Sequence, residues 1–368
     1  MSNIPTPCHI IDLDVLEHNL KRVSEFKELS GCTVLLAVKG FSAPYLFDMM
    51  QPILDGVSAS GLFEARLGYE KFGKSVQTYS PAFKSGEIED VARYSDTIVF
   101  NSIAQLERYR QIAENHDCSC GIRINPQKSS IKKEDADPCK PHSHLGIPID
   151  SLPEDIFDKI DGLHVHAMCE QYADALEELV ESIVSRFEKH LSKLKWINFG
   201  GGQMIGKDTF DIERASRCIK SIKETYGVET IIEPCEGIFV DAGSFATKVL
   251  DIIENDGQIA ILDSSPVCHM QDALFRGWDR EIKGEADNGY SYRLCGQSCF
   301  AGDTYGEYVF KEPLSIGDVL YFLDTASYTW VKNNAFNGIN FPTICTYREG
   351  FGLSVIKQYH YIDFFSNL

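Results

Sequence analysis

Residues able to do covalent or acid–base chemistry stand at the ends of short apolar segments in this chain. The first such segment, residues 32–39, reads Cys-Thr-Val-Leu-Leu-Ala-Val-Lys and ends at Lys39. A lysine amine at the end of a buried strand can form a Schiff base with an aldehyde. Lys39 therefore makes pyridoxal phosphate chemistry the first hypothesis to test.

Residues 200–202 are three consecutive glycines that follow another apolar segment. Glycine lets the backbone approach an anion closely, and its exposed amides can hold a phosphate. A tight turn between a strand and a helix is the structural alternative. We reject a P-loop, which Gly201, Gly206 and Lys207 would suggest, because Asp208 stands where a hydroxyl should meet Mg²⁺.

His164 and His166 lie in the sixth apolar segment, with Cys169 close behind them. Alternate residues of a strand share a face, so both rings should point the same way. Such a pair could bind a metal. Alternatively, one ring stacks on a planar cofactor while the other packs beside it, and we favour stacking. Glu233 ends the eighth segment and could keep a pyridine nitrogen protonated; a structural ion pair is the alternative.

Two features of the last third of the chain also suggest site residues. Residues 295–303 read Cys-Gly-Gln-Ser-Cys-Phe-Ala-Gly-Asp and place a thiol, Cys299, and a carboxylate, Asp303, in a loop of small residues. A buried, inert cysteine is the alternative. Tyr328 follows the apolar segment 319–323, and its hydroxyl could reach a phosphate or a partner subunit.

The spacing of the apolar segments predicts an α/β fold. Eight short segments alternate with helical ones, which is the pattern of a parallel (β/α)8 TIM-like barrel. We expect strands at residues 32–39, 55–60, 77–81, 97–102, 120–126, 162–168, 196–202 and 230–237. We expect helices at residues 14–29, 61–73, 102–115 and 172–194. The polar connection 127–152 is long for such a barrel and could shape a site.

After about residue 245 the pattern changes to strands without long helices between them. We expect these strands at residues 247–253, 259–263, 292–295, 308–310, 319–323 and 353–361, with the opening strand 8–11 added to them. The prediction is a C-terminal, mainly antiparallel β domain, sandwich-like or barrel-like, over residues 246–368 together with 1–11. The pyridoxal phosphate-binding barrel is predicted over residues 12–245.

Composition limits the classes of partner. The chain has 368 residues and a net charge of −19, and no basic face for nucleic acid is visible. No apolar stretch is long enough for a transmembrane helix, and the N-terminal residues do not read as a secretory signal. The twelve cysteines are not at framework spacings, which favours reduced thiols and a cytoplasmic location.

Taken in order, these residues resemble the fold-type III, alanine-racemase-like pyridoxal phosphate enzymes. Within that group they are similar to its decarboxylases, in particular the carboxynorspermidine/carboxyspermidine decarboxylases. The resemblance runs over almost the whole chain. Its markers are Leu36-Ala-Val-Lys39, Asp55–Ser60, Glu64-Ala-Arg66, Arg123-Ile-Asn-Pro126, Asp137-Pro-Cys139, Gly162–His166, Cys169-Glu-Gln171, Gly200–Gly202, Glu233-Pro234, Cys268-His-Met270, Cys299 to Asp303, Tyr328-Thr329 and Phe336-Asn-Gly338.

The resemblance implies a role for each candidate residue. Lys39 carries the cofactor and His166 stacks on its ring. Gly201 and Gly202 hold the phosphate with Tyr328, and Glu233 pairs with the pyridine nitrogen. Cys299 and Asp303 reach the site of the other subunit of a homodimer, where Cys299 returns a proton to the α-carbon after CO₂ leaves.

Three positions depart from the family pattern. Cys235 replaces the glycine of Glu-Pro-Gly, and His144 and Asp279 stand where arginines are usual. The cofactor residues are kept while two substrate-facing arginines are lost or shifted. That combination indicates an active decarboxylase with an altered substrate.

The prediction is a decarboxylase of a basic amino acid or a carboxylated polyamine, in polyamine or related diamine biosynthesis. The ammonium groups of such a substrate need carboxylates, for which we single out Asp137, Glu170, Asp272 and Asp303. The alternatives are a decarboxylase for another amine-bearing amino acid, a racemase of the same fold and a cofactor-carrier protein. Glu233 and Cys299 favour decarboxylation, because racemases of this fold commonly use arginine at the pyridine nitrogen and tyrosine as a second base.

Overall fold

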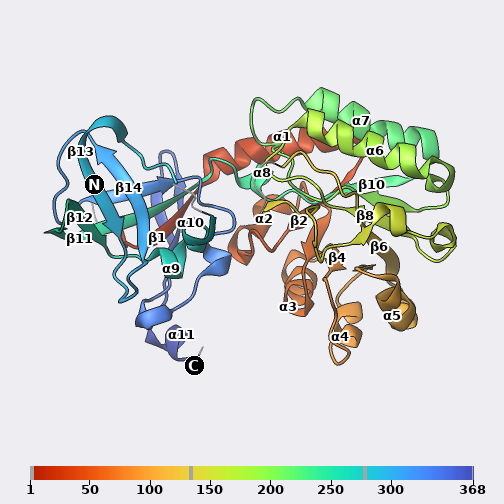
Figure 1. The fold of residues 1–368 in the computed structure, drawn as a ribbon, viewed down its shortest axis with the longest axis horizontal. Coiled ribbons are helices and arrows are strands. Elements are labelled where there is room, and N and C mark those ends of the chain that lie inside the picture. The colour runs from red at the N-terminus through yellow and green to blue at the C-terminus, as the bar shows by residue number, and fades with distance from the viewer. Residues whose placement is uncertain (1–3, 132–135, 277–279, 367) are drawn as a thin grey trace. The chain divides into compact units, whose positions relative to one another are not determined.

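The computed structural model describes residues 4–131, 136–276, 280–366 and 368, and divides the chain into two compact units (Figure 1). Residues 18–238 form the barrel unit. Residues 1–17 and 239–368 form the β unit. The chain therefore passes between the units twice, within the first helix and near residue 238.

The barrel unit is built around eight parallel strands that close on themselves. Hydrogen bonding runs in the order β2, β3, β4, β5, β6, β8, β9, β10 and back to β2. The strands are β2 (Thr33–Ala37), β3 (Gly56–Ala59), β4 (Ser75–Tyr79), β5 (Thr97–Phe100), β6 (Ser119–Asn125), β8 (Gly162–Val165), β9 (Trp196–Asn198) and β10 (Glu229–Ile232). The two-residue β7 (Ile147–Pro148) adds to the side of β6. This ring of strands confirms the predicted TIM-like barrel.

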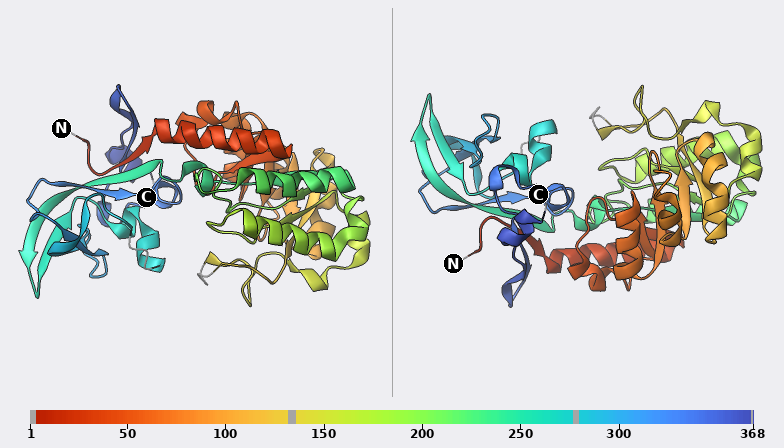
Figure 2. Two further views of the ribbon diagram at one scale, coloured as in Figure 1. Left: turned by 90° about the horizontal axis from the view of Figure 1, so that it is seen from above. Right: turned by 90° about the horizontal axis from the view of Figure 1, so that it is seen from below.

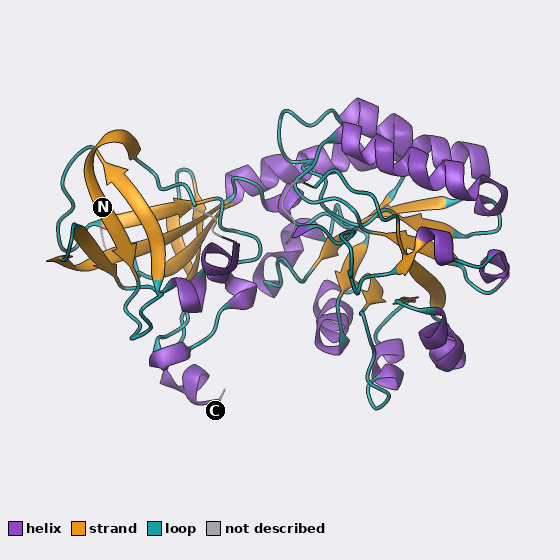
Figure 3. Cartoon of the chain, in the orientation of Figure 1, coloured by secondary structure: helices purple, strands orange, loops and turns teal. Residues whose placement is uncertain are grey.

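Helices cover the outside of the barrel strands (Figure 3). They are α1 (Leu13–Ser30), α2 (Phe47–Met50), α3 (Leu62–Leu67), α4 (Ile88–Arg93), α5 (Ile103–Asn115), α6 (Ala173–Leu191), α7 (Ile212–Tyr226) and α8 (Glu236–Phe239). Two of the three longest of these helices, α6 and α7, lie side by side (Figure 2). Each buries residues three or four positions apart, such as Leu176, Leu179 and Ile183 of α6, as an amphipathic helix against a core does.

The strands and helices of the barrel lie where the sequence predicts them, but several strands end earlier. The predicted strand 162–168, for example, ends at Val165. Lys39 lies two residues beyond the end of β2, in a turn closed by a bond from the Gly40 N–H to the Ala37 carbonyl, 3.1 Å. The shift matters because the residues with predicted roles then stand on the connections at the strand ends, not in the hydrogen-bonded ladder.

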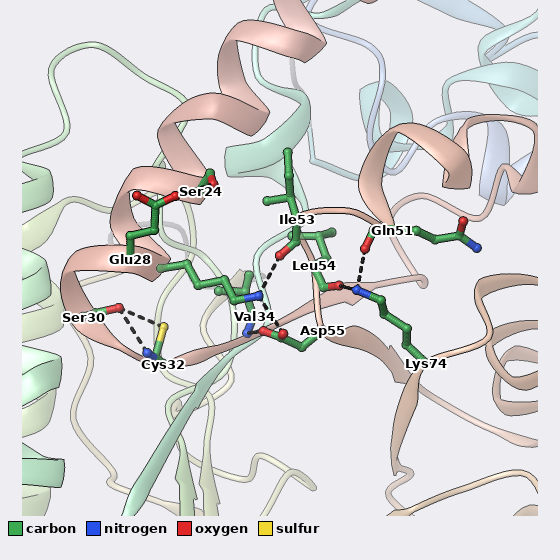
Figure 4. A network of polar contacts seen from close by, with 11 residues as sticks. Ser24, Glu28, Ser30, Cys32, Val34, Gln51, Ile53, Leu54, Asp55 and Lys74 are labelled. Carbon is green, nitrogen blue, oxygen red and sulfur yellow. Dashed lines mark hydrogen bonds and ion pairs between the residues drawn. The ribbon is translucent and has the colours of Figure 1, made fainter.

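Three aspartates tie the opposite, N-terminal ends of the barrel strands together. Asp55, Asp96 and Asp161 each precede a barrel strand, and each carboxylate accepts the N–H of the second residue of the neighbouring barrel strand, β2, β4 or β6, at 2.8–2.9 Å. The N–H of each aspartate donates in return to the carbonyl of that same residue. Around Asp55 the network also includes Lys27 and Lys74 (Figure 4). These bonds join the N-terminal ends of neighbouring strands two by two: β2 with β3, β4 with β5, and β6 with β8.

The β unit contains one eight-stranded sheet in the order β14, β13, β12, β11, β1, β16, β17, with β15 pairing with β11. Its strands are β1 (Cys8–Asp12), β11 (Gly243–Glu254), β12 (Gln258–Leu262), β13 (Glu285–Cys295), β14 (Thr304–Phe310), β15 (Val319–Leu323), β16 (Thr343–Arg348) and β17 (Gly352–Lys357). The short helices are α9 (Pro266–His269), α10 (Gln271–Arg276) and α11 (Tyr361–Phe365). A cluster of buried aromatic and aliphatic side chains, with Phe245, Tyr305 and Phe322 among them, forms its core.

The β unit differs from the sequence prediction in three details. The sheet is mainly antiparallel, as predicted, but it includes two parallel pairs that the prediction lacks, β1 with β16 and β12 with β13. The strand β16 was not predicted, although it pairs with β1 in the middle of the sheet. The predicted strand 353–361 stops at Lys357 and gives way to α11. The opening strand does join this sheet, as predicted.

Within the described ranges, none of the helices is long and apolar enough to cross a membrane. The twelve cysteines are present as thiols.

Candidate active site

Lys39 stands at the C-terminal end of the barrel, on the turn after β2. The preceding residue is held by a bond from the Val38 N–H to the Ser58 carbonyl of the next strand, 3.1 Å. The Lys39 side chain is accessible to solvent but closely surrounded by barrel residues. Loss of hydration in these surroundings lowers the pKa of Lys39, and the nearby Arg123 adds to this, while Glu233 opposes it. A larger share of the amine is therefore unprotonated and nucleophilic.

Glu233 lies just beyond β10 and is almost fully buried. Its Oε1 accepts from Asn198 Nδ2 at 2.7 Å, and its Oε2 lies 3.4 Å from His164 Nε2. Burial acts to raise the pKa of Glu233, but His164, the Asn198 amide and Lys39 outweigh it and lower that pKa below its ordinary value. Glu233 is therefore an anion at neutral pH, and among the described residues side chains hold both of its oxygens.

A layer of flat side chains lies next to Glu233. The rings of His164 and Tyr79 stack with centroids 5.4 Å apart, and the Arg123 guanidinium lies 4.6 Å from the Tyr79 centroid. Burial lowers the pKa of His164 despite Glu233, so we take its imidazole as neutral and able to donate to Glu233. The Tyr79 hydroxyl donates to Asn101 Oδ1 at 2.8 Å, which fixes the ring.

The glycines at 200–202 are required by close packing. A Cβ on Gly201 would lie 2.3 Å from the Glu233 carbonyl oxygen, and one on Gly202 would lie 2.3 Å from the Met168 carbonyl oxygen. Gly202 also has a φ of +101°, which disfavours other residues. The tight connection considered from the sequence is therefore present, and it brings the backbone of these glycines to the rim of the barrel.

His166 follows β8 and is tied to these glycines. Its Nδ1 accepts the Gly201 N–H at 3.0 Å, which leaves Nε2 to carry the proton of the neutral ring. Burial, together with Lys39 and Arg123, lowers the pKa of His166 well below its ordinary value. The ring is thus neutral and fixed in orientation beside the Lys39 amine.

Two further predicted positions flank this group. Cys235 follows Glu233-Pro234 and is buried, and burial raises the pKa of its thiol. Glu170 is exposed, with a left-handed backbone of φ +52°. A Glu170 carboxylate oxygen lies within 4.8 Å of side-chain ligand atoms of Cys169 and Glu236. Glu170 therefore adds negative charge on the connection that follows β8.

The long connection after β6 is partly described. Asp137 Oδ1 accepts the Cys139 N–H at 2.8 Å, so this carboxylate shapes a local turn. The carbonyl of His144 accepts from Asn101 Nδ2 at 2.9 Å, while its side chain is exposed. Residues 132–135 of the connection, and Asp279 in the β unit, lie outside the described residues.

In the β unit, Asp303 organises the loop that carries Cys299. The Asp303 carboxylate is buried and accepts from Ser265 Oγ at 2.7 Å and from the N–H groups of Val267 and Ser298 at 3.1 and 3.0 Å. Cys299 is exposed, and its N–H donates to Asn337 Oδ1 at 2.8 Å. Asp303 therefore holds the loop while Cys299 presents its thiol to solvent.

Tyr328 and Asp272, also in the β unit, are connected through Lys332. Lys332 Nζ lies 2.6 and 2.8 Å from the two Asp272 carboxylate oxygens. The same Nζ lies 5.4 Å from the centre of the Tyr328 ring. No local pattern in the sequence singles out Lys332.

The barrel unit thus brings Lys39, His166, Gly201, Gly202 and Glu233 together, while Cys299, Asp303, Tyr328 and Asp272 lie in the β unit. Sequence reasoning missed Asn198, Tyr79 and the part played by Arg123. Asn198 could have been found from the sequence. It lies two residues before Gly200 on a buried strand, and alternate residues of a strand share a face, so Asn198 should face the same side as Gly200.

The group around Lys39 fits pyridoxal phosphate. A nucleophilic amine, a buried carboxylate and closely approaching glycine backbone are the parts that an aldehyde, a pyridine nitrogen and a phosphate require. Within the described part of the chain, ten buried side-chain atoms lack a hydrogen-bond partner, and two of them, His164 Nδ1 and Arg123 Nε, belong to this group. These two atoms keep hydrogen-bonding capacity for a polar ligand.

Comparison with known proteins agrees with this chemistry. The family model described as pyridoxal-dependent decarboxylase, C-terminal sheet domain, matches residues 13–326. The carboxynorspermidine/carboxyspermidine decarboxylase of Campylobacter jejuni is 38% identical over 98% of both chains. The carboxyaminopropylagmatine decarboxylase of Synechocystis is 33% identical, over all of this chain and 96% of that one.

A solved structure extends the likeness to the fold. The crystal structure of carboxynorspermidine decarboxylase from Campylobacter jejuni with norspermidine superposes with a TM-score of 0.90 at 36% identity, covering 99% of this chain and 100% of that one. A lysine-centred barrel site and full-length similarity to enzymes of one reaction type lead to one assignment. The chain belongs to the pyridoxal-dependent decarboxylases.

Proposed function

We propose that this decarboxylase acts on a carboxylated polyamine of the carboxynorspermidine or carboxyspermidine kind and releases CO₂. The observation that carries the proposal is the 38% identity over 98% of both chains with an enzyme named for those two substrates. The net charge of −19 agrees with a substrate that bears several ammonium groups.

Each barrel residue then has a task. Pyridoxal phosphate, when bound, supplies an electron sink for the bond to the leaving carboxylate. The Lys39 amine attaches the cofactor, and Glu233 keeps a proton on the pyridine nitrogen. His166 packs against the ring. Gly202 donates its N–H to the phosphate. The Gly201 N–H is bound to His166, so the contribution of Gly201 is that it has no side chain and lets the backbone lie close to the phosphate. Tyr328 adds its hydroxyl.

The distal ammonium groups of the substrate need carboxylates. Glu170 is the most available of the four acidic residues that we single out, since it is exposed. Asp137 retains one carboxylate oxygen beside the oxygen that accepts the Cys139 N–H. Asp272 would share its charge with Lys332, and Asp303 with the three donors around it. We therefore assign the larger part of cation binding to Glu170 and Asp137.

The proposal includes a cytoplasmic homodimer with shared sites, in which Cys299 of one subunit serves Lys39 of the other. The exposed thiol of Cys299 on a loop held by Asp303 supports this arrangement. After CO₂ leaves, the Cys299 thiol would give its proton to the substrate α-carbon, and the thiolate would regain one from solvent.

A substrate panel tests the choice of polyamine. Purified holoenzyme is offered carboxynorspermidine, carboxyspermidine, carboxyaminopropylagmatine and meso-diaminopimelate, and CO₂ release is followed. We expect the highest kcat/KM with one of the first two. The third is included because of the Synechocystis relative, and a preference for it would replace the substrate. Activity only on diaminopimelate, or on an amino acid without a distal amine, would contradict the polyamine proposal.

Subunit mixing tests the shared site. Inactive Lys39→Ala and inactive Cys299→Ala proteins are mixed under conditions that allow subunit exchange. We expect up to about a quarter of wild-type activity to return, because a random mixture is half heterodimer and one of its two sites has both intact residues. Lack of recovery after exchange is verified with two tags would place Cys299 and Lys39 of one chain in the same site.

A further inference from the structure

A charged pair holds the face of Tyr328. Lys332 Nζ contacts both carboxylate oxygens of Asp272, at 2.6 and 2.8 Å. The Lys332 and Asp272 side chains are 32% and 14% exposed, so water screens this pair only in part. The same ammonium lies 5.4 Å from the Tyr328 ring centre, within the range of a cation–π contact.

The backbone after Tyr328 sets up this contact. Tyr328 has a left-handed φ of +59°, which is uncommon for an aromatic residue. The short 3-10 helix Trp330–Lys332 follows, and the Lys332 N–H donates to the Thr329 carbonyl at 3.0 Å. This turn reverses the chain, so that the Lys332 side chain lies over the ring of Tyr328, four residues earlier. Asp272, on α10, then fixes the end of the lysine side chain.

We infer that Lys332 is a positioning residue for cofactor binding. It holds the Tyr328 ring so that the hydroxyl is already oriented for the phosphate, and Asp272 acts by holding Lys332. The inference rests on the proposed role of Tyr328 at the phosphate. A side chain fixed before binding loses less conformational freedom on binding, which favours affinity.

Pyridoxal phosphate affinity of the full-length protein tests the inference. It is measured by absorbance and fluorescence titration, so no turnover is needed. We expect Lys332→Met to weaken binding roughly 3- to 30-fold, the range that a partly buried cation–π contact gives. Lys332→Arg should restore most of the affinity, because arginine can pair with Asp272 and lie on the ring. Asp272→Asn should weaken binding in the same direction by a smaller factor, because the substituted amide no longer fixes the Lys332 ammonium by charge.

A double-mutant cycle separates positioning from general stability. In a Tyr328→Ala background, Lys332→Met should have almost no further effect on affinity. Lys357→Met is the matched control, because Lys357 Nζ lies 4.3 Å from the Tyr359 ring centre in the same unit. That control should bind the cofactor like the wild type. Melting of the cofactor-free proteins shows that each variant is folded.

Four results would overturn the inference. Unchanged affinity in Lys332→Met would do so, as would an equal loss with and without Tyr328. A rise in KM for Asp272→Asn with unaltered cofactor affinity would assign Asp272 to the substrate instead. If Tyr328→Ala binds the cofactor normally, the proposed role of Tyr328 fails together with the inference. If Tyr328→Ala binds weakly but Lys332→Met binds normally, the role of Tyr328 stands and only the role of Lys332 fails.

Discussion

The two ends of the barrel strands use the same residue types for different purposes. At the N-terminal ends, Asp55, Asp96 and Asp161 accept backbone N–H groups of neighbouring strands. At the C-terminal end, the Glu233 carboxylate is held by the side chains of Asn198 and His164. The three aspartates therefore stabilise the ends of the strands. Glu233, held by side chains beside the Lys39 amine, is placed for chemistry.

Lysines show the same contrast. Lys74, at the N-terminal ends, donates to the carbonyls of Gln51 and Leu54, so its charge serves to join loops (Figure 4). Lys39, at the opposite ends, has a lowered pKa because surrounding residues remove water from its amine and because Arg123 lies nearby. The environment, and not the residue type, decides which lysine is nucleophilic.

The largest expected effect comes from exchanging these two lysines for alanine. Lys39→Ala should lose the absorbance of the lysine-bound cofactor and essentially all turnover. Lys74→Ala should keep both and lower only the melting temperature. Borohydride reduction followed by peptide mass mapping checks the attachment directly. Label on any lysine other than Lys39 would break the contrast between the two ends.

The next effect separates the two glutamates near the ends of β10. Glu233→Gln should lower kcat about 10²- to 10³-fold with the cofactor still bound, because a fixed charge in a dry site is lost. Glu229→Gln, at the other end, removes an exposed partner of Lys223 and should leave kcat within about twofold. Cofactor content is measured alongside turnover. Similar kcat values for both variants would remove Glu233 from the reaction.

The smallest effect concerns stability at the N-terminal ends. Asp161→Ala should lower the unfolding free energy by about 2 kcal/mol, because charged hydrogen bonds to Cys120 N–H and Ser119 are lost. Asp158→Ala, which removes only an exposed pair with Lys193, should cost about 0.5 kcal/mol or less. Urea unfolding followed by fluorescence gives both values. Turnover at a permissive temperature should be unchanged in either variant.

The Asp161 effect should depend on pH in a defined direction. Partial burial acts to raise the pKa of Asp161, but Lys195 and the Cys120 N–H outweigh it and lower that pKa. The stabilisation is therefore complete above the unfolded pKa, about 3.9, and is lost as the pH falls through the lower folded pKa. The gap between wild type and Asp161→Ala should narrow below about pH 4. A gap that widens there would show that Asp161 is protonated in the folded protein.

The alternation of apolar segments and amphipathic helices was enough to predict the barrel, because buried parallel strands and their covering helices leave a strong local pattern. The β unit was harder to predict. Strand β16 pairs with β1, more than three hundred residues away along the chain. The local sequence of residues 343–348 does not predict this pairing. The predicted strand 353–361 ended early for the same reason, since pairing and not composition sets where a strand stops.

The sequence by itself determined the order of the elements and put Lys39, His166, the three glycines and Glu233 at or just beyond strand ends. Only the tertiary structure decided what each of these residues contacts. Asn198 became the partner of Glu233 and Lys332 the partner of Asp272 through contacts 35 and 60 residues apart in the chain. A local pattern records which face of an element is buried. Contacts between elements, and the pKa shifts they cause, depend on how the chain closes in space.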